Sequence, residues 1–268
     1  MDLIQAATDL VPAPVRRSLR GTPAETAVRH LRKHRVALST ITPQTPAGAL
    51  RLRAPTDSIL TELVEEHGVY EPALTAAIHG LVDESSVLYD VGARFGYYSA
   101  LAVSSGVRPE NVHCFEAEIG AHHVLSKNHR HDRVRTERVR VGAESGRGQV
   151  SVDDHAKRHA SPTVVKIDTE GAERTVIRGM RESLATDEPT VFVEMHPHLG
   201  VSVSSVFDLL RDHGYAVSVF TDHHLVDDVA GAVDDWDGIR DGWRPVEDAR
   251  LPTDRTFLIR AAPESEDR

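Results

Sequence analysis

The fold of this chain is decided by residues 87–105, VLYDVGARFGYYSALAVSS. An apolar run at 87–91 ends in a turn with Gly92 and Gly96, and a helical pattern follows at 97–105. Glycines in such a turn let the backbone approach a ligand closely, and the start of a helix offers free N–H groups. The G-x-x-x-G spacing differs from the G-x-G-x-x-G of dinucleotide-binding turns, and no phosphate-binding Lys follows. The stretch predicts a nucleotide site, with a purely structural glycine-rich connection as the alternative.

Beyond this stretch, short apolar runs alternate with helical patterns. Strands that alternate with helices form a mostly parallel sheet with helices on both faces. The sequence therefore predicts the α/β class. The predicted strands cover 87–91, 111–116, 134–141, 163–168, 190–195, 216–220 and 256–260, and the predicted helices cover 97–105, 120–131, 173–184 and 204–213.

The N-terminal part of the chain has a different pattern. Short helical patterns interrupted by prolines occupy residues 1–35, and one or two strands are expected within residues 40–57. Two further helices are predicted at 57–67 and 71–81. Near the C-terminus, the Asp-rich residues 222–254 form a long irregular insertion, which indicates a functional or mobile segment. We expect an N-terminal extension at 1–65, the main domain at 66–262 and a disordered tail at 263–268.

Acidic residues follow two of the predicted strands. Glu116 ends the strand NVHCFE, where a carboxylate can accept hydrogen bonds from a ribose diol; a solvated loop residue is the alternative. The segment KIDTEGAE at 166–173 places Asp168, Glu170 and Glu173 at the end of the fourth strand, where open α/β sheets bind ligands. We expect Glu173 to favour the dipole of the following helix and the other two carboxylates to face a ligand.

Several segments together make the chain similar to a known family. They are DVGARFGYYS at 90–99, FEAE at 115–118, SVDDHAKRH at 151–159, VVKIDTEGAERTVIRGM at 164–180 and VFVEMHPH at 191–198. These segments resemble the FkbM-type S-adenosylmethionine-dependent methyltransferases. The resemblance implies a class I methyltransferase fold, which is a Rossmann-like, doubly wound, mostly parallel sheet of seven strands with an antiparallel last strand.

The resemblance also implies which residues bind S-adenosylmethionine. Asp90, Gly92 and Gly96 would line its methionine portion, and Glu116 would hold its ribose. The chain departs from the family at Arg94, where Asn is common, and at Ala117, where Pro is common. The full set of expected cofactor-binding residues is Glu71, Asp90, Gly92, Ala93, Arg94, Gly96, Tyr97, Tyr98, Glu116 and Ala117.

Methyl transfer is an in-line displacement, so positioning supplies most of the catalysis, and an alcohol acceptor also benefits from a general base. We expect Asp168 to orient or deprotonate the acceptor, with Glu170 and His196 assisting, because these residues end neighbouring strands. A metal site at Glu194, His196 and His198 is the alternative; because no further ligand is evident in the sequence, we expect no metal. The remaining histidines that we considered are expected to be surface groups: His122, His123, His129, His131, His155, His159, His223 and His224.

Composition limits the functional class. The chain has 268 residues and a net charge of −10, so most of its surface repels nucleic acid and we expect no nucleic-acid partner. Acidic residues are abundant and Arg far outnumbers Lys, which is typical of proteins from salt-loving organisms. No apolar run approaches the roughly 20 residues of a membrane helix, and no signal peptide is evident, which favours a cytoplasmic protein. The single Cys114 excludes an internal disulfide.

The expected partners are small molecules. By resemblance, the methyl acceptor is a hydroxyl or carboxyl group of a sugar, a glycan or a small metabolite. Residues 1–35 carry seven basic and three acidic side chains, which favours either weak association with an anionic membrane surface or a helical appendage packed on the domain. Two other functional classes remain open: a methyltransferase-like binding module without turnover, and an NAD-dependent oxidoreductase, which the glycine spacing disfavours.

Overall fold

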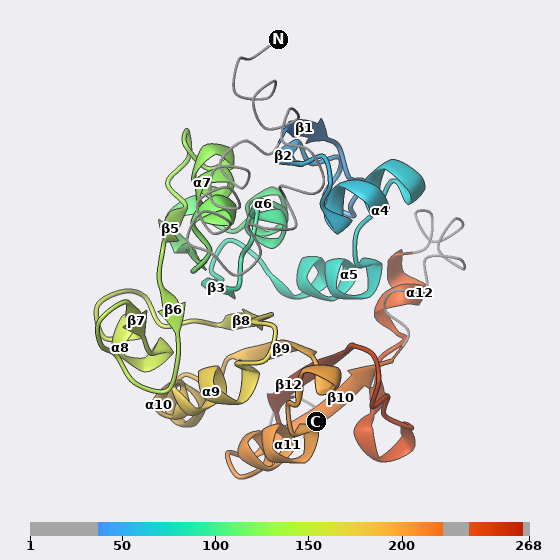
Figure 1. Ribbon diagram of the computed structural model, residues 1–268. Coiled ribbons are helices and arrows are strands. Elements are labelled where there is room, and N and C mark those ends of the chain that lie inside the picture. Colours follow the sequence, from blue (N-terminus) through green and yellow to red (C-terminus); the bar gives the residue numbers. More distant parts are fainter. Residues whose placement is uncertain (1–36, 222–235, 265–268) are drawn as a thin grey trace, which may run out of the picture. The chain divides into compact units, whose positions relative to one another are not determined.

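The computed structural model describes residues 37–221 and 236–264 (Figure 1), and from Ser39 onward these residues belong to one compact unit. The basic segment 1–35 therefore lies outside the described residues. The strands are β1 (Leu38–Ile41), β2 (Leu52–Pro55), β3 (Leu88–Val91), β4 (Val112–Phe115), β5 (Arg135–Glu137), β6 (Arg140–Val141), β7 (Gln149–Val150), β8 (Val164–Ile167), β9 (Thr190–Met195), β10 (Tyr215–Phe220), β11 (Arg244–Pro245) and β12 (Phe257–Pro263). The helices are α4 (Ile59–His67), α5 (Pro72–Leu81), α6 (Tyr97–Ser104), α7 (Ile119–Asn128), α8 (Val152–Ala156), α9 (Glu173–Arg178), α10 (Arg181–Thr186), α11 (Val203–Arg211) and α12 (Trp236–Arg240).

The main sheet has the strand order β11-β10-β12-β9-β8-β3-β4-β5 (Figure 1). β5, β4, β3, β8 and β9 are parallel, whereas β12 runs antiparallel to both of its neighbours, β9 and β10. The predicted doubly wound sheet with an antiparallel last strand is therefore confirmed, and the two-residue β11 extends it at one edge. The winding reverses between β3 and β8, which is where open α/β sheets bind their ligands.

Alternate residues of the central strands face opposite sides of the sheet. Tyr89 and Ile167 belong to a hydrophobic core that they share with α8, α9, α10 and α11. Asp90 and Lys166 alternate with these apolar residues and, like Glu194 on β9, face the other side, on which α6 contacts β3 and β4. The sheet thus carries a buried polar group on one face, close to the carboxyl ends of its central strands.

The segment before the sheet is attached to the same unit. The N–H of Arg53 on β2 donates to Asn128 at the end of α7, and the Asn128 amide donates back to the Arg53 carbonyl, both at 2.9 Å. α4 begins after Ser58, whose hydroxyl accepts a hydrogen bond from the N–H of Thr61 at 3.2 Å. The first pair of contacts attaches β2 to α7, and the Ser58 contact defines where α4 begins.

Two predicted elements are interrupted in the structure. The predicted helix 173–184 is divided into α9 and α10 at Gly179, where an added Cβ would lie 2.0 Å from the carbonyl oxygen of Gly142. The predicted strand 134–141 is divided into β5 and β6, and β6 pairs with β7 in a separate parallel sheet. The two predictions of unbroken elements were wrong, because residue periodicity does not reveal a close backbone approach between distant segments.

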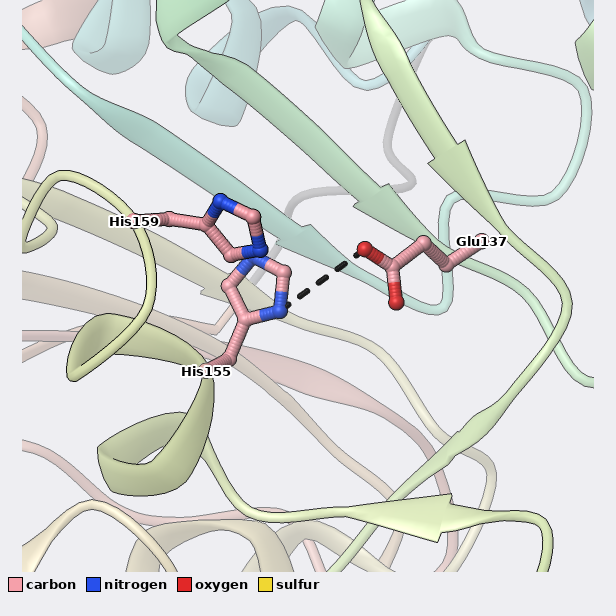
Figure 2. Close-up of side chains that lie close together, drawn as sticks. All are labelled: Glu137, His155 and His159. Carbon is pink, nitrogen blue, oxygen red and sulfur yellow. Dashed lines mark ion pairs between the residues drawn. The ribbon is translucent and has the colours of Figure 1, made fainter.

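The expectation that the scattered histidines are surface groups is wrong for two of the described ones. His129 and His155 are only 6% and 1% exposed. Each has a ring nitrogen in a hydrogen bond inside the protein, which offsets part of the cost of burial. Figure 2 shows that His155 lies close to Glu137 and His159. The pair 223–224 lies outside the described residues.

Candidate functional site

The turn after β3 contains two glycines that other residues could replace only with strain. Gly92 has a φ of 78°, and an added Cβ would lie 1.7 Å from the carbonyl oxygen of Asp168. Gly96 has a φ of 86° and precedes α6; an added Cβ would lie 2.8 Å from the side chains of both Leu125 and His129. Only glycine combines a positive φ with the absence of a Cβ. The two glycines therefore let the turn pack directly against the end of β8 and against α7.

A pocket lies where this turn meets the end of β8. Six of the residues predicted from the sequence as site residues line it together, and the start of α4 contributes two apolar side chains. The pocket is located at the reversal point between β3 and β8, as expected for an open α/β sheet. Its lining residues are Ile59, Leu60, Tyr70, Gly92, Ala93, Arg94, Phe95, Tyr97, Tyr98, Lys166 and Asp168.

Asp90 and Lys166 form a buried ion pair on neighbouring strands, with Oδ1 and Nζ 3.6 Å apart. Neither carboxylate oxygen of Asp90 has a hydrogen-bond partner among the residues that the structure describes. Burial raises the pKa of this carboxyl in spite of the nearby ammonium group. Burial also acts to lower the pKa of Lys166, but the charges of Asp168 and Asp90 outweigh it and raise that pKa. Lys166 also donates to the carbonyl of Gly92 at 3.2 Å and lies 5.1 Å from the centre of the Tyr98 ring.

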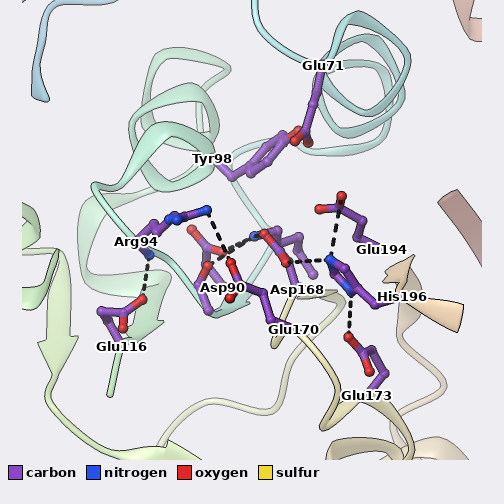
Figure 3. Close-up of polar contacts among 12 residues, drawn as sticks. Glu71, Asp90, Arg94, Tyr98, Glu116, Asp168, Glu170, Glu173, Glu194 and His196 are labelled. Atoms are coloured by element: carbon purple, nitrogen blue, oxygen red, sulfur yellow. Dashed lines mark hydrogen bonds and ion pairs between the residues drawn. The ribbon is translucent and has the colours of Figure 1, made fainter. Parts of the chain in front are cut away.

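Glu116, the expected ribose ligand, lies at the end of β4 beside the turn. Its Oε2 accepts a hydrogen bond from the N–H of Arg94 at 2.9 Å (Figure 3), and its Oε1 accepts one from the N–H of Glu118 at 2.7 Å. Burial raises the pKa of Glu116, and these two hydrogen bonds act in the opposite direction. Each oxygen has a second lone pair with which it can accept from a ligand. Ala117, next to it, is exposed.

Arg94 and Glu170 both have left-handed backbones, with φ values of 51° and 50°. Their exposed side chains form an ion pair of 3.4 Å (Figure 3). Asn adopts this backbone region more readily than Arg does, which gives a physical reason for Asn as the usual family residue at position 94. The structure leaves Glu170 at the surface, with 63% of its side chain exposed, instead of bringing it together with Asp168 and His196.

Glu71 and the two tyrosines of α6 connect the pocket to α5. The buried carboxylate of Glu71, just before α5, accepts a hydrogen bond from the Tyr98 hydroxyl (Figure 3). The hydroxyl of Tyr97 forms a 2.9 Å hydrogen bond with that of Thr75. Burial raises the pKa of both tyrosines, so they stay neutral and act as hydrogen-bonding groups. Both residues pack α6 against α5 and also line the pocket.

His196, directly after β9, lies among carboxylates (Figure 3). Its Nδ1 is 2.7 Å from Oε1 of the fully buried Glu173, and its Nε2 is 3.8 Å from Oδ1 of Asp168 and 3.8 Å from Oε1 of Glu194. A carboxylate only accepts hydrogen bonds, so Nδ1 carries the proton in the neutral ring and Nε2 has a free lone pair. Burial lowers the pKa of His196, but Glu173 and the neighbouring carboxylates outweigh it and raise the pKa above the usual 6.5.

The structure adds residues to this part of the site that the sequence reasoning missed. Glu173 lies in the first turn of α9, as expected for a charge that favours the helix dipole, but it also holds His196, a role that was not predicted. Burial, with a contribution from Asp168, raises the pKa of Glu194 to about 7. Lys166 could have been found from strand alternation, because residues two apart face the same side of a strand. One ligand atom from each of Asp168, Glu194 and His196 lies within 4.8 Å of the others. The group that could hold a metal ion therefore contains Asp168 where the sequence suggested His198.

The sheet order and the pocket at its reversal point define a class I methyltransferase fold. The particular family follows from a family model described as the methyltransferase FkbM domain, which matches residues 62–217. This match covers more than half of the chain. The chain therefore belongs to the FkbM methyltransferase family.

Solved methyltransferase structures are similar to this chain at low sequence identity. The FkbM methyltransferase from Methylobacillus flagellatus KT is 17% identical, with a TM-score of 0.45, over 68% of this chain and 45% of that chain. This chain thus spans less than half the length of that protein. Precorrin-6y C5,15-methyltransferase from Geobacter metallireducens GS-15 is 18% identical (TM-score 0.45; 72% and 86% covered). A TehB-like methyltransferase from Corynebacterium glutamicum is 10% identical (TM-score 0.45; 75% and 92% covered).

No match was found among curated proteins. Within the described residues, every helix is too short or too polar to cross a membrane.

Proposed function

We propose that this protein transfers the methyl group of S-adenosylmethionine to a hydroxyl group of a small molecule or glycan. The observation that carries the proposal is the carboxyl of Asp90, which is buried at the β3–β8 reversal point of a methyltransferase-family chain and has no hydrogen-bond partner among the described residues. Leaving such a group unsatisfied costs about 1–3 kcal/mol. A ligand that brings a cationic or N–H donor to Asp90 would remove this cost.

The charges around the pocket suit a ligand with positive charge. Lys166 is surrounded by Asp168, Asp90, Glu71 and Glu194, and the charge of each of them raises its pKa. One ammonium group among four carboxyls leaves this region negative when they are ionised. S-adenosylmethionine carries a sulfonium and an ammonium group, and when bound it supplies an electrophilic methyl group.

Separate residues would hold the two ends of this cofactor. Asp90 and the turn at Gly92 would bind the methionine portion, because the carboxylate, although ion-paired with Lys166, accepts no hydrogen bond from the described residues and the glycine allows close backbone approach. Glu116 would bind the ribose with the second lone pairs of its two oxygens, since its first hydrogen bonds to backbone N–H groups already orient the carboxylate. Tyr97 and Tyr98 would complete the wall.

His196 is the residue that we assign as the general base. Glu173 holds the proton on Nδ1, so Nε2 is the atom that accepts the hydroxyl proton of the acceptor. The resulting imidazolium is stabilised by Glu173, Glu194 and Asp168, the groups that raise the pKa of His196. Asp168 lines the pocket and lies 3.8 Å from Nε2, so it would orient the acceptor hydroxyl toward His196.

A hydroxyl acceptor fits this arrangement better than a carboxylate acceptor. A carboxylate is already ionised at neutral pH and needs no base, whereas an alcohol loses its proton during the transfer. The pair formed by Glu173 and His196 is buried at the end of the strand that follows β8, and a carboxylate acceptor would leave it without a chemical role. The net charge of −10 also supports a small acceptor over a nucleic acid.

The test is transfer of tritium from [methyl-³H]S-adenosylmethionine to a panel of sugars, other alcohols and their carboxylic-acid analogues. We expect labelled alcohols, and a loss of about 100-fold or more in rate for His196→Asn, the range of general-base catalysis. Asp168→Asn should also lose activity, whereas Glu170→Gln should retain it because Glu170 is exposed. Transfer to carboxylic acids alone, or an unimpaired His196→Asn variant, would contradict the assignment.

A binding module without turnover is the competing reading. Such a module would bind S-adenosylhomocysteine but would transfer no tritium to any compound of the panel. Its affinity for S-adenosylhomocysteine would be unchanged in His196→Asn. The geometry around Nε2 favours turnover, since a binding module has no need for a buried carboxylate that fixes the histidine tautomer.

A further inference from the structure

A second group of potential metal ligands shares no residue with the proposed methyl-transfer site. It consists of Glu137 at the end of β5, His155 on α8 and His159 in the turn after α8 (Figure 2). One ligand atom from each of the three residues lies within 4.8 Å of the others. The two imidazole rings are close together, with their centres 4.3 Å apart.

The ring of His155 contains a buried nitrogen without a hydrogen-bond partner. His155 is 1% exposed, and its Nε2 lies 2.9 Å from Nδ1 of His113. Its Nδ1 forms no hydrogen bond in the described part of the structure and faces Oε1 of Glu137 at 3.8 Å (Figure 2). When Nε2–H donates to His113, the free lone pair of His155 Nδ1 points toward a carboxylate. Two acceptors that face each other are stabilised by a cation between them, and here the nitrogen of His155 is buried while Glu137 is partly exposed.

We propose that Glu137, His155 and His159 bind a Zn²⁺ ion. Two imidazoles and one carboxylate are a common ligand set for zinc, whereas Mg²⁺ and Ca²⁺ prefer oxygen ligands throughout. Ligands of a tetrahedral zinc ion lie roughly 3.3 Å apart, as follows from metal–ligand distances of about 2.0–2.1 Å. The three ligand atoms lie within 4.8 Å of one another, with His155 Nδ1 and Glu137 Oε1 3.8 Å apart, and zinc would draw them closer together. Because His159 is only half-buried, a water molecule can take the fourth position.

His113 gives this site the second layer of contacts that zinc histidines usually have. A ligating imidazole commonly donates its other N–H to an acceptor, which fixes the tautomer and orients the ring. His155 has this arrangement, with Nε2 bonded to His113 and Nδ1 facing Glu137. Tyr89 packs edge-on against the His155 ring, with centres 5.1 Å apart, and restricts its rotation further.

The local chain geometry brings the two histidine ligands to one side. His155 and His159 are four residues apart, the spacing that places side chains on one face of a helix. α8 ends at Ala156, but the N–H groups of Arg158 and His159 continue the turn by donating to the carbonyls of His155 and Ala156. Residue 159 therefore lies on nearly the same face of this helical turn as residue 155.

The ion would connect two segments that are distant in sequence. Glu137 belongs to the last strand at one edge of the sheet, and its carbonyl accepts a hydrogen bond from the N–H of Glu116 at 3.0 Å. Zinc would therefore attach α8 to the strand end that lies beside the expected ribose ligand. This role is structural and does not depend on the proposed methyl transfer.

Zinc binding by the tag-free full chain tests the proposal. The protein is stripped with a chelator, dialysed and titrated with ZnCl₂ by calorimetry, and a parallel titration with Co²⁺ is followed by visible absorption. We expect one saturable site in wild type, with the intense absorption of four-coordinate Co²⁺. His159→Ala and Glu137→Gln should weaken zinc binding by more than about 10-fold, the lower end of what loss of even an outer-shell partner costs.

Matched variants distinguish this site from others. His123→Ala removes an exposed histidine and should bind zinc as wild type does. His196→Asn disrupts the cluster of Asp168, Glu194 and His196 and should also retain the ion. We avoid replacing His155, because its buried ring packs in the core and its loss could prevent folding. Far-ultraviolet circular dichroism and the melting temperature of the stripped proteins check that His159→Ala and Glu137→Gln are folded.

The possible outcomes are decisive. A zinc-dependent rise in melting temperature in wild type, His123→Ala and His196→Asn that is absent in His159→Ala and Glu137→Gln supports the site. Absence of zinc binding in wild type overturns it. Zinc binding that survives in folded His159→Ala and Glu137→Gln, or that is lost only in His196→Asn, assigns the ion elsewhere and also overturns it.

Discussion

Replacing Glu173 by Gln isolates the charge that holds His196. Oε1 of Glu173 accepts hydrogen bonds from both His196 Nδ1 and the N–H of Gly171, at 2.7 and 3.0 Å, while Oε2 has no hydrogen-bond partner in the described residues. In the Gln variant, the carbonyl oxygen can keep both hydrogen bonds and the amide nitrogen takes the place of Oε2. The variant therefore keeps the shape of the side chain and the histidine tautomer, and it removes the negative charge.

The expected change in the pKa of His196 follows from the position of Glu173. Burial acts to lower the pKa of His196, and the hydrogen bond to Glu173 is foremost among the contacts that raise it. A charge of opposite sign at this distance commonly shifts a pKa by about 1–3 units. Because Glu194 and Asp168 remain, we expect the pKa of His196 to fall by about 1–2 units in Glu173→Gln. This corresponds to about 1.4–2.7 kcal/mol of lost interaction with the imidazolium.

The pH dependence of stability has a definite sign. A histidine whose pKa is raised in the folded state stabilises the protein at pH values below its unfolded pKa, and this contribution is lost as the pH rises through the folded pKa. The free energy of unfolding that Glu173→Gln loses relative to wild type should therefore be larger at about pH 6 than at about pH 9. Urea unfolding at the two pH values measures the difference.

The direct assay is an NMR titration of the histidine Cε1–H signals, which requires no knowledge of the acceptor. The chain has 16 histidines, so His196→Asn is needed to assign the signal of His196. Glu170→Gln is the matched control, because Glu170 is exposed and pairs with Arg94. A pKa of His196 in Glu173→Gln that stays within about 0.3 unit of wild type, or rises, would refute the reasoning.

Three further substitutions test the turn and its surroundings. Asp90→Asn removes one carboxylate of the buried ion pair with Lys166, which keeps Asp168 at 3.4 Å as a partner, so the ligand-free protein should lose about 3 kcal/mol of stability; an unchanged or higher melting temperature contradicts this. Gly92→Ala places a Cβ 1.7 Å from the carbonyl oxygen of Asp168 and should cost at least about 2 kcal/mol in urea unfolding; an unchanged midpoint contradicts this. Arg94→Asn relieves a φ of 51° and loses only an exposed ion pair with Glu170, so a gain of about 0.5–1 kcal/mol is expected; a clear loss of stability in thermal unfolding would show that the ion pair outweighs the backbone.

The sequence predicts the sheet well because the signals for it are local. The apolar run 87–91, the two glycines of the turn and the KIDTEGAE segment each belong to one strand end. The alternation of strands and helices predicts a mostly parallel sheet, and the family resemblance implies its doubly wound order. The break at Gly179 could not be predicted, because it arises from contact with the carbonyl of Gly142, 37 positions earlier in the chain. Contacts between distant segments leave no periodic signal.

The candidate site could likewise be predicted from the sequence only in part. Asp168 and His196 could be predicted to lie close together, because parallel strands bring their carboxyl ends to one edge. The role of Glu173 could not, since a carboxylate in the first turn of a helix already has a local explanation in the helix dipole. Burial of His155 beside Glu137 was missed for a related reason: single histidines in a polar segment resemble surface residues, and their partner lies on another strand.

Calorimetric titration of the full chain with S-adenosylhomocysteine tests the central claim most directly, with NAD as the control ligand. The account predicts saturable binding of one S-adenosylhomocysteine per chain, no binding of NAD, and at least about 10-fold weaker binding of S-adenosylhomocysteine by Asp90→Asn, a loss of about 1.4 kcal/mol. Absence of S-adenosylhomocysteine binding in the folded wild-type protein, or equal affinity in Asp90→Asn, would contradict the site at the end of β3.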